Sequence, residues 1–289
     1  MANVERDFGH NATSNGMNKE GDYNDEDAYL RRIRTAGSIS ISPEQFEKLF
    51  LQPQNRVSGD LRSTFANPTP LALLGFLLCL SPLSWDLMGV RGAGGNGAAS
   101  IGAYFFMGGL LMLIGAIGEF FLGNTFPFVV FGSFGGYWLT FAATLDGTFG
   151  ASSAYSPDPT KPYLGASEPA FYASFAYFLL FMGLLCFIYL IAALRTNVVF
   201  VVIFFTLVIA FGLLAGAYWQ IAEGAAAFGG KLVIAAGAFL WVTCVAGWWI
   251  FAAQVLACVD FPLNLPVGDL STMIRGASQR MAAKEGHAA

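Results

Sequence analysis

The chain has 289 residues, of which 55% are hydrophobic and 12% are charged, and its formal net charge is −4. A soluble domain usually has about 25% charged residues, and 18 of the 34 charged residues of this chain fall within residues 1–66. This distribution excludes a soluble globular protein and predicts an all-α, polytopic membrane protein with a polar N-terminal tail. The net charge says little about partners, and no nucleic-acid partner is expected.

Residues 1–60 form this tail, which we expect to be cytoplasmic and largely disordered because it is charged and poor in long apolar runs. It has no apolar run long enough for a cleavable signal peptide, so the first membrane helix would itself target the chain. Ser42-Pro43-Glu44-Gln45 matches a capping box and predicts a short amphipathic helix near residues 43–51. This helix would either lie at the membrane surface or act as a regulatory docking segment.

Six apolar segments follow, each about as long as the 20 residues that a helix needs to cross a bilayer. We expect them to form a six-helix transmembrane transport domain within residues 61–260, followed by a cytoplasmic C-terminal tail of residues 261–289. The spans are predicted near residues 68–90, 99–122, 126–147, 169–194, 197–221 and 229–257.

Lysine and arginine predict the orientation, because cytoplasmic loops are enriched in these residues. With the N-terminus in the cytoplasm, six spans return the C-terminus to the same side. Twelve basic residues then face the cytoplasm and three face the outside. Arg56, Arg62 and Arg195 are close enough to the spans to support this direction. Both termini are therefore expected to be cytoplasmic.

The first span opens with Asn67-Pro68-Thr69-Pro70. Asn67 is a favourable N-cap, and proline is favourable at the first helical position, where its missing N–H costs nothing. The free amides at such a helix end carry partial positive charge and attract anions. These four residues are therefore either a plain helix cap or a binding site for a small carboxylate.

Ionisable side chains within apolar helices are costly and are candidates for function. Glu119 is predicted near the cytoplasmic end of the second span, whereas Asp86 and Asp146 are predicted near the outer ends of the first and third spans. Each carboxylate is either functional or close enough to the membrane surface to reach water. Glu119 is the candidate for proton coupling.

An enzyme is not expected, because the only histidines, His10 and His287, lie in the terminal tails. The sequence has no Walker-type phosphate loop, nucleophile elbow or cluster of metal ligands, so no cofactor and no metal are expected. The four cysteines lie in or beside apolar runs without a Cys-x-x-Cys spacing, which predicts buried free thiols.

Several motifs resemble those of the acetate uptake transporters of fungi and bacteria. Residues 67–76 are similar to the family signature Asn-Pro-Ala-Pro-Leu-Gly-Leu followed by Gly-Phe, with Thr69 and Ala72 as the departures. Glu119 with the following Gly-Asn-Thr-Phe turn is similar to a second signature, and so is the run at residues 131–138. The resemblance covers roughly residues 60–270, and the long polar N-terminus is similar to that of the fungal branch.

The resemblance implies six helices per subunit around a substrate path, a hexameric assembly and passage of acetate and other short carboxylates. It also implies an aromatic and aliphatic constriction, which motif alignment places at Phe76, Phe134 and Leu207. A narrow apolar neck excludes hydrated ions and tolerates the methyl end of a monocarboxylate. Phe134 stands where bacterial members carry Tyr, which removes a hydroxyl donor, whereas Thr69 adds a hydroxyl near the first motif.

We therefore interpret the chain as a multi-pass plasma-membrane transporter for acetate and other small monocarboxylates, assembled as a homo-oligomer in the lipid bilayer. Coupling to protons through Glu119 is expected. One alternative is a passive channel for acetate. Another is a carboxylate sensor that signals through the charged N-terminal tail.

Overall fold

The computed structural model describes residues 64–270 and 273–274, all within one compact unit, Ile41–Ala289. The regular secondary structure of this part of the chain is helical apart from an isolated antiparallel bridge between Asn197 and Asp269. Six helical segments are long and apolar enough to cross a membrane, which confirms the predicted number of spans. The amphipathic helix predicted near residues 43–51 and the rest of the tail at residues 1–60 lie outside the described residues.

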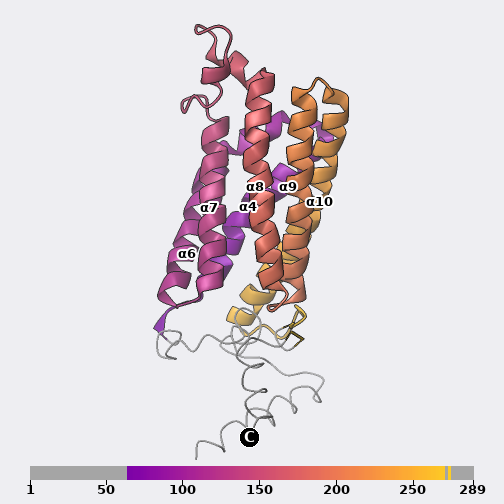
Figure 1. Cartoon of the computed structure of the whole chain (residues 1–289). Coiled ribbons are helices and arrows are strands. Elements are labelled where there is room, and N and C mark those ends of the chain that lie inside the picture. Colours follow the sequence, from indigo (N-terminus) through magenta and orange to yellow (C-terminus); the bar gives the residue numbers. More distant parts are fainter. Residues whose placement is uncertain (1–63, 271–272, 275–289) are drawn as a thin grey trace, which may run out of the picture. The chain divides into compact units, whose positions relative to one another are not determined.

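Five spans are single helices and the second is composite (Figure 1). The helices α4, α7 and α9 begin at the same end of the bundle, at the bottom of Figure 1, and this end is named the lower end. The observed ends of the spans differ from the predicted ones by a few residues. The spans are α4 (Thr69–Met88), the second span made of α5 (Ile101–Ala103), η3 (Tyr104–Leu111) and α6 (Met112–Phe121), α7 (Thr125–Leu145), α8 (Pro169–Ala193), α9 (Val198–Ala222) and α10 (Ala226–Cys258).

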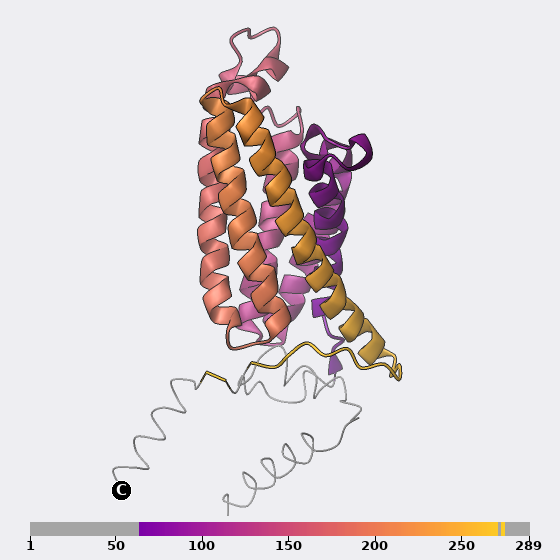
Figure 2. The same cartoon turned by 90° about the vertical axis from the view of Figure 1, so that its right-hand side faces the viewer.

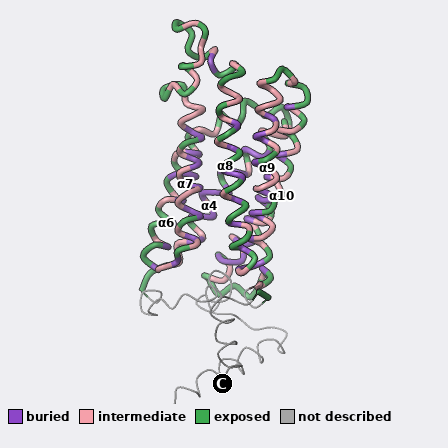
Figure 3. The backbone as a smooth tube through the Cα atoms, in the orientation of Figure 1, coloured by how far each residue is buried: buried purple, intermediate pink, exposed green. Residues whose placement is uncertain are grey.

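The helix α4 packs between the second span and α10. It packs against η3 and α6 and also against α10, while α7 covers α6 and η3, and α9 packs against both α8 and α10. Figure 2 shows α10 starting beside α9 and diverging from it toward the lower end. Buried and exposed positions alternate around the helices in Figure 3, and large apolar side chains such as Phe106, Phe181 and Ile188 are exposed. Helices that are apolar on all sides are typical of membrane spans.

The second span contains a π-helical stretch, η3, although its sequence predicted one regular helix. A Cβ added at Gly108 or Gly109 would overlap the side chain of Trp138 or Leu139. The two glycines therefore let α7 approach the second span closely. The ring of Tyr104 stacks on the indole of Trp138 at this contact, with the centroids 5.1 Å apart.

The residues after α10 fold back across the lower end (Figure 2). The N–H of Val198 donates to the carbonyl of Gly268 (2.8 Å), and the indole N–H of Trp249 donates to the carbonyl of Pro266 (2.8 Å). Val267 is buried between these two anchor points. The beginning of the predicted C-terminal tail is therefore part of the packed structure.

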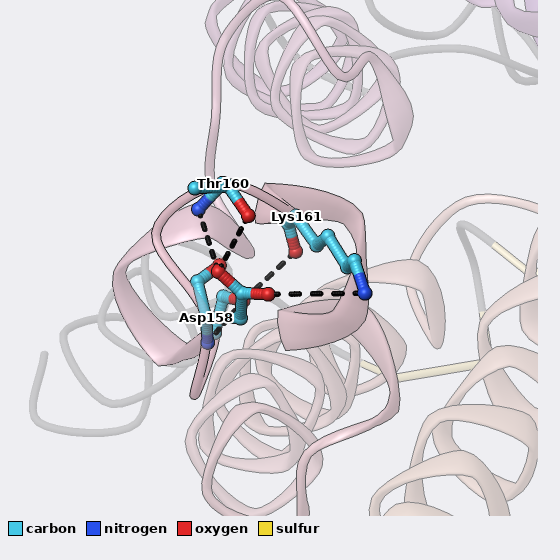
Figure 4. A network of polar contacts seen from close by, with 4 residues as sticks. Asp158, Thr160 and Lys161 are labelled. Atoms are coloured by element: carbon cyan, nitrogen blue, oxygen red, sulfur yellow. Dashed lines mark hydrogen bonds and ion pairs between the residues drawn. The ribbon is translucent and has the colours of Figure 1, made fainter.

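The connection between α7 and α8 contains the short 3-10 helices Ser153–Tyr155 and Pro162–Ser167 and is organised around Asp158. The backbone N–H and the hydroxyl of Thr160 donate to Asp158 Oδ1 (2.9 and 2.7 Å), and Lys161 Nζ lies 3.9 Å from Asp158 Oδ2 (Figure 4). The hydrogen bonds from the Thr160 hydroxyl and amide lower the pKa of Asp158. This connection is thus held in place by local polar contacts.

Three cysteines, Cys79, Cys186 and Cys244, are buried free thiols. Cys258 is the last residue of α10 and is exposed, so the prediction of burial is wrong for this cysteine. The apolar run ends there, so the helix has passed the end of the packed bundle.

Candidate functional site

The start of α4 is built as the sequence predicted for a capped helix. The backbone N–H of Thr69 donates to Asn67 Oδ1 (2.9 Å). Pro68 already has helical backbone angles (φ −81°, ψ −17°), and its carbonyl accepts from the N–H of Leu71 (3.2 Å). Asn67 therefore accepts a capping hydrogen bond from the first helical residue, while Pro68 holds the N-cap position and Thr69 and Pro70 begin α4. Asn67 is half-buried, whereas Thr69 is buried.

Glu119 lies next to this first turn and is fully buried. Its Oε1 accepts a hydrogen bond from the hydroxyl of Thr69, and its Oε2 accepts from Nδ2 of Asn124 (2.6 Å). The backbone N–H of Asn124 also donates to the carbonyl of Glu119 (2.9 Å). The alternative in which Glu119 simply reaches water is therefore wrong, because its carboxylate joins the start of α4 to the turn between α6 and α7.

Two glycines of α6 make this contact possible. A Cβ at Gly118 would come within 2.6 Å of the Pro68 side chain, and a Cβ at Gly115 would come within 2.6 Å of Ala72 Cβ. Both distances are far shorter than van der Waals contact. The absence of side chains at these positions lets α4 and α6 approach closely enough for Thr69 to meet Glu119.

A small cavity adjoins Thr69 at the lower end. Its volume is about 10 Å³, which is about the space of one water molecule. Its lining comes from the first turns of three helices, α4, α7 and α9, together with deeper aromatic residues of α7 and α9. The lining residues are Thr69, Phe126, Pro127, Val130, Phe131, Phe200 and Phe204.

An asparagine lies one or two residues before the start of each of these three helices. Asn197 Oδ1 accepts from the N–H of Phe200 (2.9 Å), just as Asn67 caps α4, while Asn124 precedes Thr125 and binds Glu119. Helix N-termini carry partial positive charge. Three of them therefore meet around the cavity at the lower end, which we name the lower cavity.

A second cavity, of about 20 Å³, is lined by all three residues that were predicted to form a constriction. These residues are Phe76, Phe134 and Leu207. The rings of Phe76 and Phe134 meet edge to face, with centroids 5.6 Å apart and planes at 79°. We name this space the neck cavity. The other lining residues are Leu80, Leu83, Tyr137, Trp138, Phe211, Leu214 and Leu240.

The two cavities lie on the same faces of their helices. On α9 the lining residues run from Phe200 and Phe204 to Leu207, Phe211 and Leu214, at intervals of three and four residues that place them on one side of a helix. The linings on α4 and α7 also continue from the lower cavity to the neck cavity. The two cavities therefore follow one another along a single interior line, and each has room for only about one or two water molecules.

Two other predicted candidates do not join this line. Asp86 and Asp146 are half-buried near the ends of α4 and α7, opposite the lower end. Asp146 Oδ1 accepts from the N–H of Thr148 (2.9 Å) in the following turn. In the described part of the chain no three His, Cys, Asp or Glu side chains form a group suited to a metal ion.

Sequence reasoning missed Asn124 as a partner of Glu119 and Tyr137 and Trp138 as lining residues. The sequence suggested a family motif for the run that contains Tyr137 and Trp138, and a place near the outer membrane interface for these two aromatic residues. Their spacing of three and four residues from Phe134 could have indicated the same helix face.

Comparison with known proteins supports a family assignment. The model of the GPR1/FUN34/yaaH family matches residues 50–272. Protein alcS of Aspergillus fumigatus is 45% identical over 247 residues, which make up 86% of this chain and 91% of that protein. Acetate transporter protein patA of Aspergillus clavatus is 34% identical over 208 residues, covering 72% of this chain and 79% of that protein.

A solved structure, that of the bacterial acetate channel SatP, has a similar fold, with a TM-score of 0.54 and 24% identity over 71% of this chain and 99% of that one. At this identity the likeness concerns the fold. The family match and the relatives confirm the resemblance drawn from the motifs, and with it a membrane transport protein rather than an enzyme. The chain belongs to the GPR1/FUN34/yaaH family.

Proposed function

We propose that the chain carries acetate and other small monocarboxylates along the line that joins the neck cavity and the lower cavity. The observation that carries this proposal is the convergence of Phe76, Phe134 and Leu207 on one cavity, in line with a second cavity at three helix starts. The methyl end of a small acid is compatible with the apolar neck, and its carboxylate is attracted by the helix N-termini. The relative patA, named an acetate transporter, supports the same substrate class.

The binding part of this path is proposed at Asn67, Pro68, Thr69 and Pro70. A helix N-terminus contributes only about 0.3–2 kcal/mol to binding an anion. Weak binding suits a site that must release its substrate after each passage. The lower end is proposed to face the cytoplasm of a cell whose plasma membrane holds the protein as a hexamer, in agreement with the distribution of lysine and arginine.

Proton coupling is proposed to act through Glu119. A hydroxyl group donates and accepts hydrogen bonds, so the contact between Thr69 and Glu119 is compatible with either protonation state. With the carboxylate ionised, Thr69 donates to Glu119, and with it protonated, Glu119 donates to Thr69. The carboxyl group can therefore exchange a proton without losing its contact with the start of α4.

The neck must open for passage. The cavity volume of about 20 Å³ is close to that of one water molecule and smaller than a carboxylic acid. Separation of the Phe76 and Phe134 rings is the smallest movement that widens this point. Both a proton-coupled transporter and a gated passive channel require it, so the two differ only in whether uptake can proceed uphill.

The substrate class is tested by uptake of labelled acetate into liposomes that contain the purified protein, with empty liposomes to subtract diffusion of the neutral acid. We expect saturable uptake that propionate inhibits and that larger di- and tricarboxylates do not. Uptake no faster than in empty liposomes would contradict the proposal and favour a sensor role.

A further inference from the structure

Gln254 on α10 combines deep burial with an unused hydrogen-bonding capacity. Its side chain is 2% exposed, and within the described part of the chain neither its Oε1 nor its Nε2 has a hydrogen-bond partner. Glutamine offers two N–H donors and one carbonyl acceptor. Buried side-chain polar atoms nearly always have a partner, so both ends of this amide call for an explanation.

The helical register places Gln254 on the face of α10 that is turned toward the path. Leu240 lines the neck cavity, and a Cβ at Gly247 would come within 2.6 Å of Leu77 of α4. Gln254 follows at the same interval of seven residues. Two such intervals rotate a position by only about 40° around an α-helix, so Leu240, Gly247 and Gln254 share one face.

The contact with α4 also gives the level of Gln254 along the bundle. Leu77 and Gly247 are in contact, and α4 and α10 run in opposite directions. Seven residues of helix span about 10 Å, so Gln254 lies about level with Pro70, which follows Thr69 of the lower cavity in α4. Figure 2 shows α10 diverging from α9 toward the lower end, and α4 also packs against α10.

We propose that Gln254 is a specificity-determining residue at the lower end of the path, where its amide N–H donates to the carboxylate of a short monocarboxylic acid. The proposal rests on the proposed function. A neutral amide suits this position because it binds a carboxylate without the strength of a charged partner. Its carbonyl can accept a hydrogen bond from the protonated acid or from a water that accompanies the anion.

The test is Gln254→Leu, which keeps the approximate size of the side chain and removes both polar atoms. Loss of one hydrogen bond to a charged carboxylate corresponds to a rise of about 10- to 150-fold in the KM for acetate. Because the polar atoms have no partner among the described residues, their removal should leave the thermal midpoint unchanged or raise it. A merely structural glutamine would give the same midpoint but an unchanged KM.

Thr243→Val is the matched control. Thr243 is another buried polar residue on α10, but its hydroxyl is paired with that of Thr206 (2.7 Å), so its loss should leave the KM for acetate unchanged. Gln254→Met serves if the Leu variant does not fold, since it is unbranched like glutamine. Saturable wild-type uptake with an unchanged KM in the Gln254 variant would overturn this assignment alone, whereas no wild-type uptake would overturn the proposed function and this assignment with it.

Discussion

Truncation of Phe76 to alanine tests the neck directly. Phe76 is 6% exposed, lines the neck cavity and meets the ring of Phe134 edge to face at 5.6 Å. Removal of a buried phenylalanine ring costs about 3–5 kcal/mol of stability, of which the aromatic pair contributes about 0.5–1.5 kcal/mol. The wall of the neck cavity then opens by the volume of the ring.

The wider neck should admit longer acids. One methylene in an apolar pocket changes discrimination by about 10- to 200-fold, so we expect uptake of butyrate relative to acetate to rise at least about 10-fold in Phe76→Ala. The assay is uptake of each labelled acid into liposomes with equal amounts of folded protein.

Phe141→Ala is the control, because Phe141 is also 6% exposed but does not line the neck cavity. It should lower the thermal midpoint to a similar extent and leave the butyrate-to-acetate ratio as in the wild type. An unchanged ratio in a folded Phe76→Ala variant would refute the assignment of the neck.

Four further changes test the lower end and the tail. Glu119→Gln should abolish the dependence of acetate uptake on a proton gradient, and an unaltered pH dependence would exclude Glu119 from coupling. Thr69→Val removes the hydroxyl donor to a buried carboxylate and should cost about 1.5–3 kcal/mol of stability, which Thr69→Ser should largely restore. Gly118→Leu should lower the thermal midpoint by driving α6 from α4, whereas Gly102→Leu, which meets open space, should not. Deletion of residues 1–60 should leave flux intact, and a loss of flux would favour a regulatory role.

The six spans could be predicted because length and apolarity are properties of each segment taken alone. The cap at Asn67 was predictable for the same reason, since it depends on adjacent residues. The constriction came from motif similarity, and the structure brings Phe76, Phe134 and Leu207 to one cavity although they lie on three helices. The role of these residues in selectivity stays a prediction.

The burial of Glu119 could not be predicted from its own segment. It depends on Gly115 and Gly118, which let the start of α4 come close, and on Thr69, which is 50 residues away in the sequence. The π-helical stretch at Tyr104–Leu111 could not be predicted for a similar reason. Its glycines pack against side chains of α7, and this contact is not visible in the sequence of the second span alone.

The most direct test of proton-coupled carriage is the initial rate of labelled acetate uptake into liposomes that contain the full-length protein, with an imposed proton gradient and with the gradient collapsed by an ionophore. Glu119→Gln and empty liposomes are measured in parallel. We predict a saturable, protein-dependent initial rate above the rate in empty liposomes, lowered on collapse of the gradient and without that dependence in Glu119→Gln. Saturable protein-dependent uptake whose initial rate is the same with and without the gradient would contradict coupling and identify a passive channel.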